Sequence, residues 1–218
     1  MSTILCYGDS HVWGAIPGSI DPINFLLQRY AKNVRWPGVL QTALGEKFVV
    51  VEEAINGRTT TVDELVPGRP ARNGLALLTP ALEAHYPIAA VVLMLGTNDL
   101  KVQYKRSVED IVVSMKQLIA VIRQSNKGRV GNAPQVFLIA PPPIIKIHNL
   151  HAQFNDTSIE MSRKLGAAYK QLAELEGCAF LDSASMITSS TKDGFHFDEE
   201  GHQYLGRRVA QEIEIMLV

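Results

Sequence analysis

Two short motifs combine residue types that can carry out nucleophilic catalysis. Gly8-Asp9-Ser10 places a serine hydroxyl directly after an apolar segment, and Asp193-Gly194-Phe195-His196 brings a carboxylate and an imidazole together near the other end of the chain. A serine hydroxyl is a poor nucleophile until a base takes its proton, and histidine is well suited to that task. An aspartate that accepts the other imidazole N–H fixes the histidine tautomer. The sequence therefore predicts Ser10 as a nucleophile, His196 as its base and Asp193 as the partner of His196.

Two further motifs carry hydrogen-bond donors that can stabilise a negatively charged oxygen. Asn56-Gly57 follows a second apolar segment, and Gly96-Thr97-Asn98-Asp99 follows a third. The tetrahedral intermediate of acyl transfer needs such donors around its oxyanion. The candidates are the backbone N–H groups of Ser10 and Gly57 and the side-chain amide of Asn98. Gly57 has no Cβ, so a substrate can approach its backbone closely.

The elements that must position these motifs alternate along the chain. Short apolar segments at residues 3–7, 48–51, 88–95, 135–140 and 178–181 are predicted as strands, and segments 36–44, 74–85, 107–123, 156–176 and 199–216 as helices. Continuous Val, Ile and Leu runs are typical of parallel strands covered on both faces. The alternation predicts an α/β fold, a three-layer α/β/α sandwich. The carboxyl ends of parallel strands share one edge of a sheet, so the four motifs should meet there, flanked by the irregular segments 16–35 and 141–155.

The composition is that of a globular protein and argues against several other classes. The chain has 218 residues, of which 46% are hydrophobic and 20% charged, and its formal net charge is −1. This length suits a single domain spanning residues 1–218, and the near-neutral balance argues against nucleic-acid binding. Two cysteines are too few for a disulfide framework, and no apolar run approaches the roughly 18 residues of a membrane span. The first residues lack a signal-peptide pattern, so we expect a cytoplasmic protein with a small-molecule substrate and no membrane partner.

Taken together, the four motifs resemble those of the SGNH hydrolases, also called the GDSL esterase/lipase superfamily. The blocks are Gly8-Asp9-Ser10, Asn56-Gly57, Gly96-Thr97-Asn98-Asp99 and Asp193-Gly194-Phe195-His196, in order and over almost the whole chain. The sequence looks closest to bacterial arylesterases and mycobacterial acyltransferase-like esterases. That closer likeness rests on Trp13-Gly14, Val34-Arg35-Trp36 and Arg58-Thr59-Thr60 as well.

The resemblance implies a flavodoxin-like sheet of five parallel strands, a Ser10–His196–Asp193 triad, and Gly57 and Asn98 in an oxyanion hole beside Ser10. It implies no cofactor and no metal, and it suggests a homo-oligomer, a dimer or larger. We expect hydrolysis of small-acyl or aryl carboxylic esters through an acyl-enzyme, with acyl transfer to alcohols as an added activity. A carbohydrate acetylesterase, a thioesterase or a lysophospholipase are the alternatives, and a nucleotide-binding or inactive α/β module is the alternative outside the enzymes. Four apolar residues are candidates for the substrate pocket: Trp13, Ile144, Phe154 and Phe195.

Other polar residues are expected to have structural roles. Asp9 and Asp99 are interpreted as hydrogen-bonded organisers of their loops rather than acid–base groups. His148 and His151 have no cysteine or carboxylate at metal-ligand spacing, so a solvated loop is expected there. His202 is expected on a helix surface. Arg69 and Arg72 are expected in a solvated loop, with an anion or interface contact as the alternative.

Overall fold

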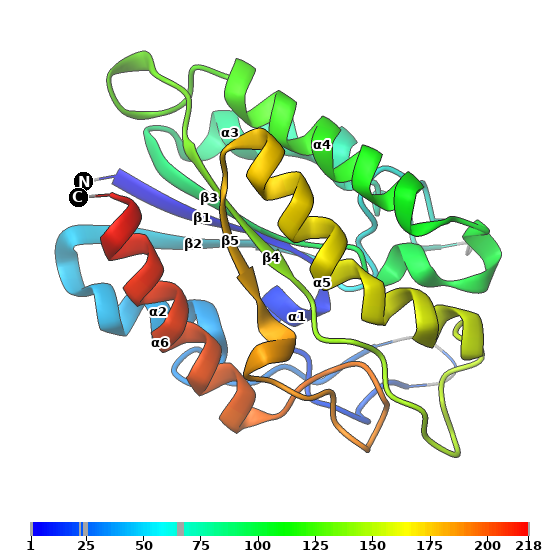
Figure 1. Ribbon diagram of the computed structural model, residues 1–218. Coiled ribbons are helices and arrows are strands. Elements are labelled where there is room, and N and C mark those ends of the chain that lie inside the picture. The colour runs from blue at the N-terminus through cyan, green and yellow to red at the C-terminus, as the bar shows by residue number, and fades with distance from the viewer. Residues whose placement is uncertain (1, 22, 24–25, 65–67, 218) are drawn as a thin grey trace.

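A five-stranded, all-parallel sheet lies between two layers of helices in the computed structural model (Figure 1). The structure describes residues 2–21, 23, 26–64 and 68–217. The strands are β1 (Ser2–Gly8), β2 (Phe48–Ala54), β3 (Ile88–Met94), β4 (Gln135–Ala140) and β5 (Ala179–Asp182), in the spatial order β2-β1-β3-β4-β5. The helices are α1 (Ser10–Trp13), α2 (Trp36–Leu44), α3 (Gly74–His85), α4 (Val108–Gln124), α5 (Asp156–Glu176) and α6 (Glu199–Met216).

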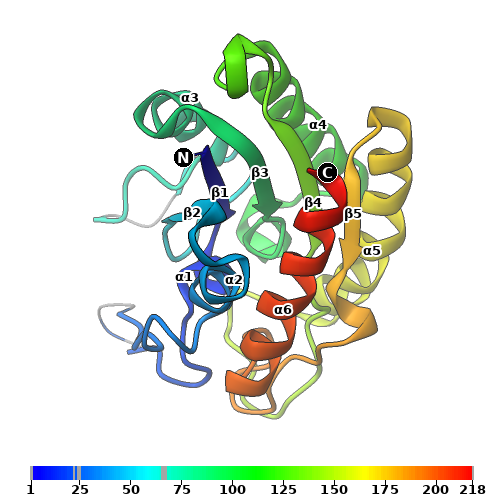
Figure 2. The same cartoon turned by 90° about the vertical axis from the view of Figure 1, so that its left-hand side faces the viewer.

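The three central strands, β1, β3 and β4, are largely buried on both faces because helices cover both sides of the sheet, whereas the residues of the edge strands β2 and β5 are mostly half-buried. Helices α3, α4 and α5 lie on one side, and α2 and α6 lie on the other (Figures 1 and 2). Along β3 every residue is buried, and from Ala90 to Met94 successive side chains enter opposite cores. Val91 and Leu93 belong to the core under α4, whereas Ala90 and Val92 belong to the core under α2 and α6. The predicted three-layer α/β sandwich is confirmed.

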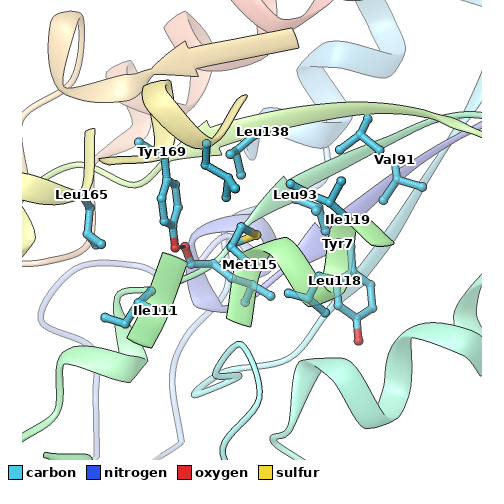
Figure 3. Packing of buried hydrophobic residues seen from close by; sticks show 14 of the residues in the cluster. Tyr7, Val91, Leu93, Ile111, Met115, Leu118, Ile119, Leu138, Leu165 and Tyr169 are labelled. Carbon is cyan, nitrogen blue, oxygen red and sulfur yellow. Dashed lines mark hydrogen bonds between the residues drawn. The ribbon is translucent and has the colours of Figure 1, made fainter. Parts of the chain in front are cut away.

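The core under α4 and α5 is anchored by two buried tyrosines. Figure 3 shows Met115, Leu118 and Ile119 of α4 close to the side chains of the central strands. Tyr7 donates its hydroxyl to the Gly74 carbonyl at 2.6 Å, and Tyr169 donates to the Leu95 carbonyl at 3.1 Å. Both phenols therefore satisfy their polar group inside an apolar layer, as buried aromatic hydroxyls require.

The sheet order brings three loops together at one edge. In the register of the sheet, Gly8 at the end of β1 lies between Ala54 of β2 and Met94 of β3. The segments that follow these three residues therefore start side by side, at the point where the strand order reverses. Ligands bind at this point in open α/β sheets. A Cβ on Gly8 would lie 2.1 Å from Val12 Cγ2 and 2.6 Å from the Met94 carbonyl oxygen, so the tight turn into α1 requires glycine.

The helix boundaries follow local signals, with one exception. Helix α4 begins with a capping box in which Ser107 and Asp110 exchange side-chain and backbone hydrogen bonds, as the sequence indicated. Helix α1 was not predicted, because its four residues are too few to show a helical period. Residues 22, 24 and 25 of the irregular segment 16–35 lie outside the described residues. Across the described part of the chain, no helix is both long enough and apolar enough to cross a membrane.

Candidate active site

Ser10, His196 and Asp193 form a continuous hydrogen-bonded chain at the carboxyl edge of the sheet. Ser10 is the first residue of α1, and its Oγ lies 2.8 Å from Nε2 of His196. On the other side of the ring, Nδ1 lies 2.8 Å from Oδ2 of Asp193. A proton on Nδ1 leaves Nε2 free to accept the Ser10 hydroxyl proton. The structure therefore brings the three predicted residues together in the geometry of a nucleophile, a base and an orienting carboxylate.

The Asp193 carboxylate is fixed by backbone donors as well as by the imidazole. Its Oδ1 accepts from the N–H groups of Phe195 at 3.2 Å and His196 at 3.0 Å. Its Oδ2 accepts from the Gly18 N–H at 2.8 Å in addition to the His196 ring. Four donors thus hold the Asp193 carboxylate in place, and the carboxylate in turn holds the His196 imidazole.

The surroundings lower the pKa values of both Asp193 and His196, which favours general-base catalysis. Burial alone would raise the pKa of Asp193, but the hydrogen bond and charge of His196 and the Gly18 N–H outweigh it and lower that pKa to about 2. Burial is also the largest influence on His196, and it lowers the pKa of that imidazole from 6.5 against the opposing effect of Asp193. At neutral pH the pair therefore consists of a carboxylate and a neutral imidazole.

The pH dependence of ester hydrolysis should report this arrangement. Only the neutral imidazole can take the Ser10 proton, so kcat/KM should rise with pH and level off above the His196 pKa. Because that pKa is lowered, the midpoint of the acid limb should lie below 6.5. A pH–rate profile of the free enzyme with a neutral ester checks this, and a midpoint above 7 would contradict the burial argument. No second loss should come from Asp193 until the pH approaches about 2.

A second buried histidine lies beside the first, and the sequence analysis did not single it out. Nδ1 of His11 lies 3.0 Å from Oδ1 of Asp9, and its Nε2 lies 2.7 Å from the Phe195 carbonyl oxygen. Burial opposes the charged form, but Asp9 and the Phe195 carbonyl outweigh it and raise the pKa of His11. His11 thus ties the Ser10 turn to the loop that carries His196. Its partner Asp9 is the loop organiser that the sequence indicated, since it also caps α1 through the His11 N–H.

The candidate oxyanion donors line the same pocket as Ser10. Within the described part of the chain, neither the Ser10 N–H nor the Gly57 N–H donates to another residue. Asn98 lies in a tight turn after β3, and its Nδ2 donates to Oδ2 of Asp9 at 3.0 Å and to the Arg58 carbonyl at 3.2 Å. An oxyanion would take over the second and longer of these bonds, while Asp9 keeps the amide in place.

Two guanidinium groups hold the peptide that carries the Gly57 N–H. Nη2 of Arg69 donates to the Asn56 carbonyl oxygen at 3.1 Å, and Nε of Arg72 donates to the same oxygen at 2.8 Å. In a trans peptide the carbonyl and the next N–H point in opposite directions. The two arginines therefore orient the Gly57 N–H away from themselves and toward the pocket. The expectation that Arg69 and Arg72 lie in a solvated loop was wrong, because these contacts draw both side chains against the site.

Asn98→Ala tests the side-chain member of the donor set. Loss of one oxyanion donor lowers kcat by on the order of 100- to 1,000-fold in comparable sites. We expect a loss of that size in kcat with a much smaller change in KM, because the bond strengthens only as charge develops. Steady-state kinetics on the purified variant, with its thermal unfolding as a control for folding, gives the answer. A near-wild-type kcat would remove Asn98 from this role.

The pocket beside Ser10 is small, and its lining residues form an apolar set and a polar set, called the apolar wall and the polar wall. Its volume is about 40 Å³. The apolar wall consists of Ile20, Leu27, Phe154 and Phe195, and the polar wall of Arg69, Lys101, His151 and Gln153. The ring centroids of Phe154 and Phe195 lie 5.2 Å apart, and that of Phe195 lies 4.5 Å from His196.

Two residues predicted for the pocket lie elsewhere. Ile144 is fully buried in the core under α4 and α5, because its N–H bonds to Ser162 Oγ at 2.9 Å and draws the strand-following segment against α5. Trp13 packs under the Arg29 guanidinium, whose carbon lies 4.9 Å from its ring centroid, and it is not among the lining residues. His151, which was expected in a solvated loop, does line the pocket.

Two other polar residues complete the description of the site's surroundings. His202 was expected on a helix surface, and this was wrong: it faces the core, accepts from the Trp36 N–H at 3.3 Å, and burial lowers its pKa to about 3. Asp99 accepts from Thr60 and Arg106, so it organises its loop as predicted. Within the residues that the structure describes, no group of three or more His, Cys, Asp or Glu side chains could hold a metal ion.

Comparisons with known proteins agree with this geometry. The model of the GDSL-like Lipase/Acylhydrolase family matches residues 6–204. The native aryl esterase of M. smegmatis has 34% sequence identity and a TM-score of 0.91 over 100% of both chains. A carbohydrate acetylesterase from Sinorhizobium meliloti has 31% identity and a TM-score of 0.89 over 99% of this chain and 100% of its own. A search of curated proteins finds no match.

Proposed function

Because the chain belongs to the GDSL-like lipase/acylhydrolase family, the SGNH hydrolases, and is an esterase of that family, we propose that it hydrolyses small-acyl or aryl carboxylic esters through an acyl-enzyme on Ser10. The observation that carries the proposal is the hydrogen bond of 2.8 Å between Ser10 Oγ and Nε2 of His196, at the mouth of a pocket of about 40 Å³. The nucleophile, its base and a confined acyl site thus lie within one cavity. We propose that the whole activity resides in a single domain, residues 1–218.

In the first half of the reaction, Ser10 Oγ attacks the ester carbonyl carbon while its proton passes to Nε2 of His196. Asp193 stabilises the imidazolium that forms and keeps the ring in place. The negative carbonyl oxygen lies among the N–H groups of Ser10 and Gly57 and the Asn98 amide. The intermediate collapses when His196 returns its proton to the leaving alcohol oxygen and the C–O bond to that oxygen breaks. The acyl group then remains on Ser10.

In the second half, water replaces the alcohol next to His196. Nε2 takes a proton from the water as its oxygen attacks the acyl carbon, and the same donors stabilise the second oxyanion. His196 then protonates Ser10 Oγ, which releases the carboxylic acid and restores the resting hydrogen bond. An alcohol in place of water would give acyl transfer by the same steps, so the proposal includes that activity wherever an alcohol competes with water.

The pocket volume supports a short acyl group. One water molecule needs about 10–15 Å³ of volume measured in this way, so a pocket of about 40 Å³ matches the space of a few waters. Acetyl and propionyl groups are of that size, whereas an octanoyl chain is much longer. This favours a small-acyl esterase over the thioesterase and lysophospholipase alternatives, which need a long apolar channel.

Initial rates on 4-nitrophenyl esters from acetyl to dodecanoyl, with Ser10→Ala as the blank, test the proposal. We expect the highest kcat/KM at acetyl or propionyl and a blank with no significant rate. A maximum at octanoyl or longer would show that the loops form an acyl channel, and the long-chain alternatives would then replace the proposal.

A carbohydrate acetylesterase is the second candidate, because a structural relative of comparable similarity, from Sinorhizobium meliloti, carries that name. A carbohydrate acetylesterase would use the same first step as the proposed esterase and would also need only a small acyl site. The leaving group separates the two candidates: an acetylated sugar should be a poor substrate beside phenyl acetate if the aryl preference holds. Faster release of acetate from acetylated xylose than from phenyl acetate would favour the second candidate.

We also propose that the protein forms a homo-oligomer. Two large apolar side chains on the loop of residues 16–35 are exposed, Ile23 by 88% and Leu26 by 67%. Large apolar side chains this exposed are candidates for contact with another protein surface. Light scattering at micromolar concentration should give at least twice the 24.0 kDa mass of one chain. A monomer mass would end this proposal without affecting the esterase.

A further inference from the structure

The polar wall of the pocket has an excess of positive charge. Arg69 and Lys101 both line the pocket, and among the described residues Glu64 is the one carboxylate within ion-pair distance of either cation. Oε2 of Glu64 lies 4.0 Å from Nη1 of Arg69 and 4.0 Å from Nζ of Lys101. One negative charge therefore faces two positive charges. Asp99, two positions before Lys101, is paired with Arg106 at 2.6 Å.

The Lys101 ammonium borders the pocket, and no acceptor among the described residues lies within hydrogen-bond distance of it. Its side chain is 5% exposed, and in the described part of the chain Nζ makes no interaction shorter than the 4.0 Å contact to Glu64. An ammonium group has three N–H donors, and leaving them unsatisfied in a buried site is costly. Oε1 of Glu64 is turned away from Lys101 by its bond from the Tyr104 hydroxyl at 3.0 Å. The N–H donors of Lys101 are thus open to an acceptor that enters the pocket.

The positive charge extends over the polar wall. Burial is the main reason why the pKa of His151 is lowered, and the charges of Lys101 and Arg69 lower it further. The wall that contains Arg69, Lys101 and His151 is electropositive because it carries two cations and Glu64 is the one carboxylate within ion-pair distance of them among the described residues. The apolar side chains of Phe154 and Phe195 line the same pocket. The pocket is therefore matched to a molecule with an anionic side and an apolar side.

We propose that Lys101 binds a carboxylate carried by the ester substrate, so that the enzyme prefers anionic esters to neutral esters of the same shape. This inference rests on the proposed esterase function and names the substrate class of that site. Arg69 supports the carboxylate with charge while it keeps its bond to the Asn56 carbonyl. A neutral hydroxyl or amide would satisfy one donor of Lys101 but would leave the excess charge of the wall unbalanced. Hydrogen bonds between charged partners are about twice as strong as neutral ones.

Two matched substrate pairs test the proposal and locate the carboxylate. The first pair, 4-acetoxybenzoate and 4-acetoxybenzamide, carries the group on the leaving alcohol. The second pair, monomethyl succinate and methyl succinamate, carries it on the acyl side. Within each pair, a carboxylate and a carboxamide have nearly the same shape and differ in charge. We expect kcat/KM to favour the carboxylate by about tenfold in one pair.

Variants at Lys101 assign the preference to its charge. In Lys101→Met the ratio of the two kcat/KM values should fall to about one, and in Lys101→Arg it should stay close to the wild-type ratio. Lys105→Met removes the same charge from an exposed residue of the same loop, so its ratio should match the wild type. A measurement on the unmodified enzyme covers the case in which Lys101→Met does not fold: 4-hydroxybenzoate should inhibit at about tenfold lower concentration than 4-hydroxybenzamide.

The outcomes separate this inference from the proposed function. Equal kcat/KM values within both pairs, with hydrolysis that depends on Ser10, would overturn the carboxylate site and leave the esterase intact. A carboxylate preference that persists in Lys101→Met would overturn the role of Lys101. Absence of Ser10-dependent hydrolysis for all four esters would instead contradict the proposed function itself.

Discussion

Replacing Ser10 with alanine should lower kcat for 4-nitrophenyl acetate by at least about 10⁴-fold. Among the described residues, Nε2 of His196 has one hydrogen-bond partner, the Ser10 hydroxyl at 2.8 Å. Without that hydroxyl, His196 has no nucleophile to activate at this position. The oxyanion donors and the pocket remain, and they alone leave only a small rate above that of water. The loss should appear in kcat, with KM little changed, because the methyl group of alanine fits the space of the serine side chain.

The control for Ser10→Ala is a serine of the same chain that lies away from the site. Ser185 is exposed, and its hydroxyl bonds to the Asp182 carbonyl at 2.7 Å. Ser185→Ala should keep the wild-type rate when it is purified in the same way, which excludes a contaminating esterase as the source of activity. A Ser10→Ala rate within tenfold of the wild type would contradict the mechanism.

Asp193→Asn should lower kcat by about 10³- to 10⁴-fold, less than or close to the loss at Ser10. Four donors point at the two carboxylate oxygens: the N–H groups of Gly18, Phe195 and His196 and the His196 ring. An asparagine must turn its NH₂ group toward some of these donors. If the NH₂ faces Nδ1, the imidazole changes tautomer and Nε2 becomes a donor that cannot accept the Ser10 proton. If the NH₂ faces the backbone, the loop that carries His196 must shift.

The matched control for this variant is Asp198→Asn. Asp198 caps α6 by accepting from the Gly201 N–H at 3.0 Å, and asparagine serves equally well at such a position. Asp198→Asn should therefore keep both rate and thermal stability. Steady-state kinetics and thermal unfolding of the two variants separate a tautomer effect from general destabilisation. A loss smaller than tenfold in Asp193→Asn would remove that carboxylate from its orienting role.

Much of the fold follows from local sequence, because strand runs and helix caps are local signals. The bounds of α2, α3, α5 and α6 agree with the predicted helices, and β4 agrees with the predicted strand. The order of the motifs along the chain placed Ser10, Asn98 and His196 at one edge, because each follows an element of a parallel sheet. The register of Gly8 between Ala54 and Met94 gives this convergence its physical basis.

The parts that the sequence did not predict depend on contacts between distant residues. His11 bonds to the Phe195 carbonyl, 184 positions away in the chain, and no local sequence pattern predicts that contact. His202 lies on a helix whose polar composition suggested solvent, yet its ring is buried against Phe197 at 4.3 Å between ring centroids. Arg69 and Arg72 looked like loop residues because their common acceptor, the Asn56 carbonyl, lies in another segment. Contacts between segments far apart in the chain decide all three cases, and composition does not predict such contacts.

The most direct test of the account is to label the enzyme with an aryl phosphonate ester and to locate the adduct by peptide mass spectrometry. The phosphonate is attacked as an ester is, and the product cannot be hydrolysed readily, so it records which atom acts as the nucleophile. We predict one adduct per chain, on Ser10, which forms in the wild type, slows below the His196 pKa and is absent from Ser10→Ala. An adduct on another residue, or an active enzyme that takes no label, would contradict the assignment of Ser10 as the nucleophile.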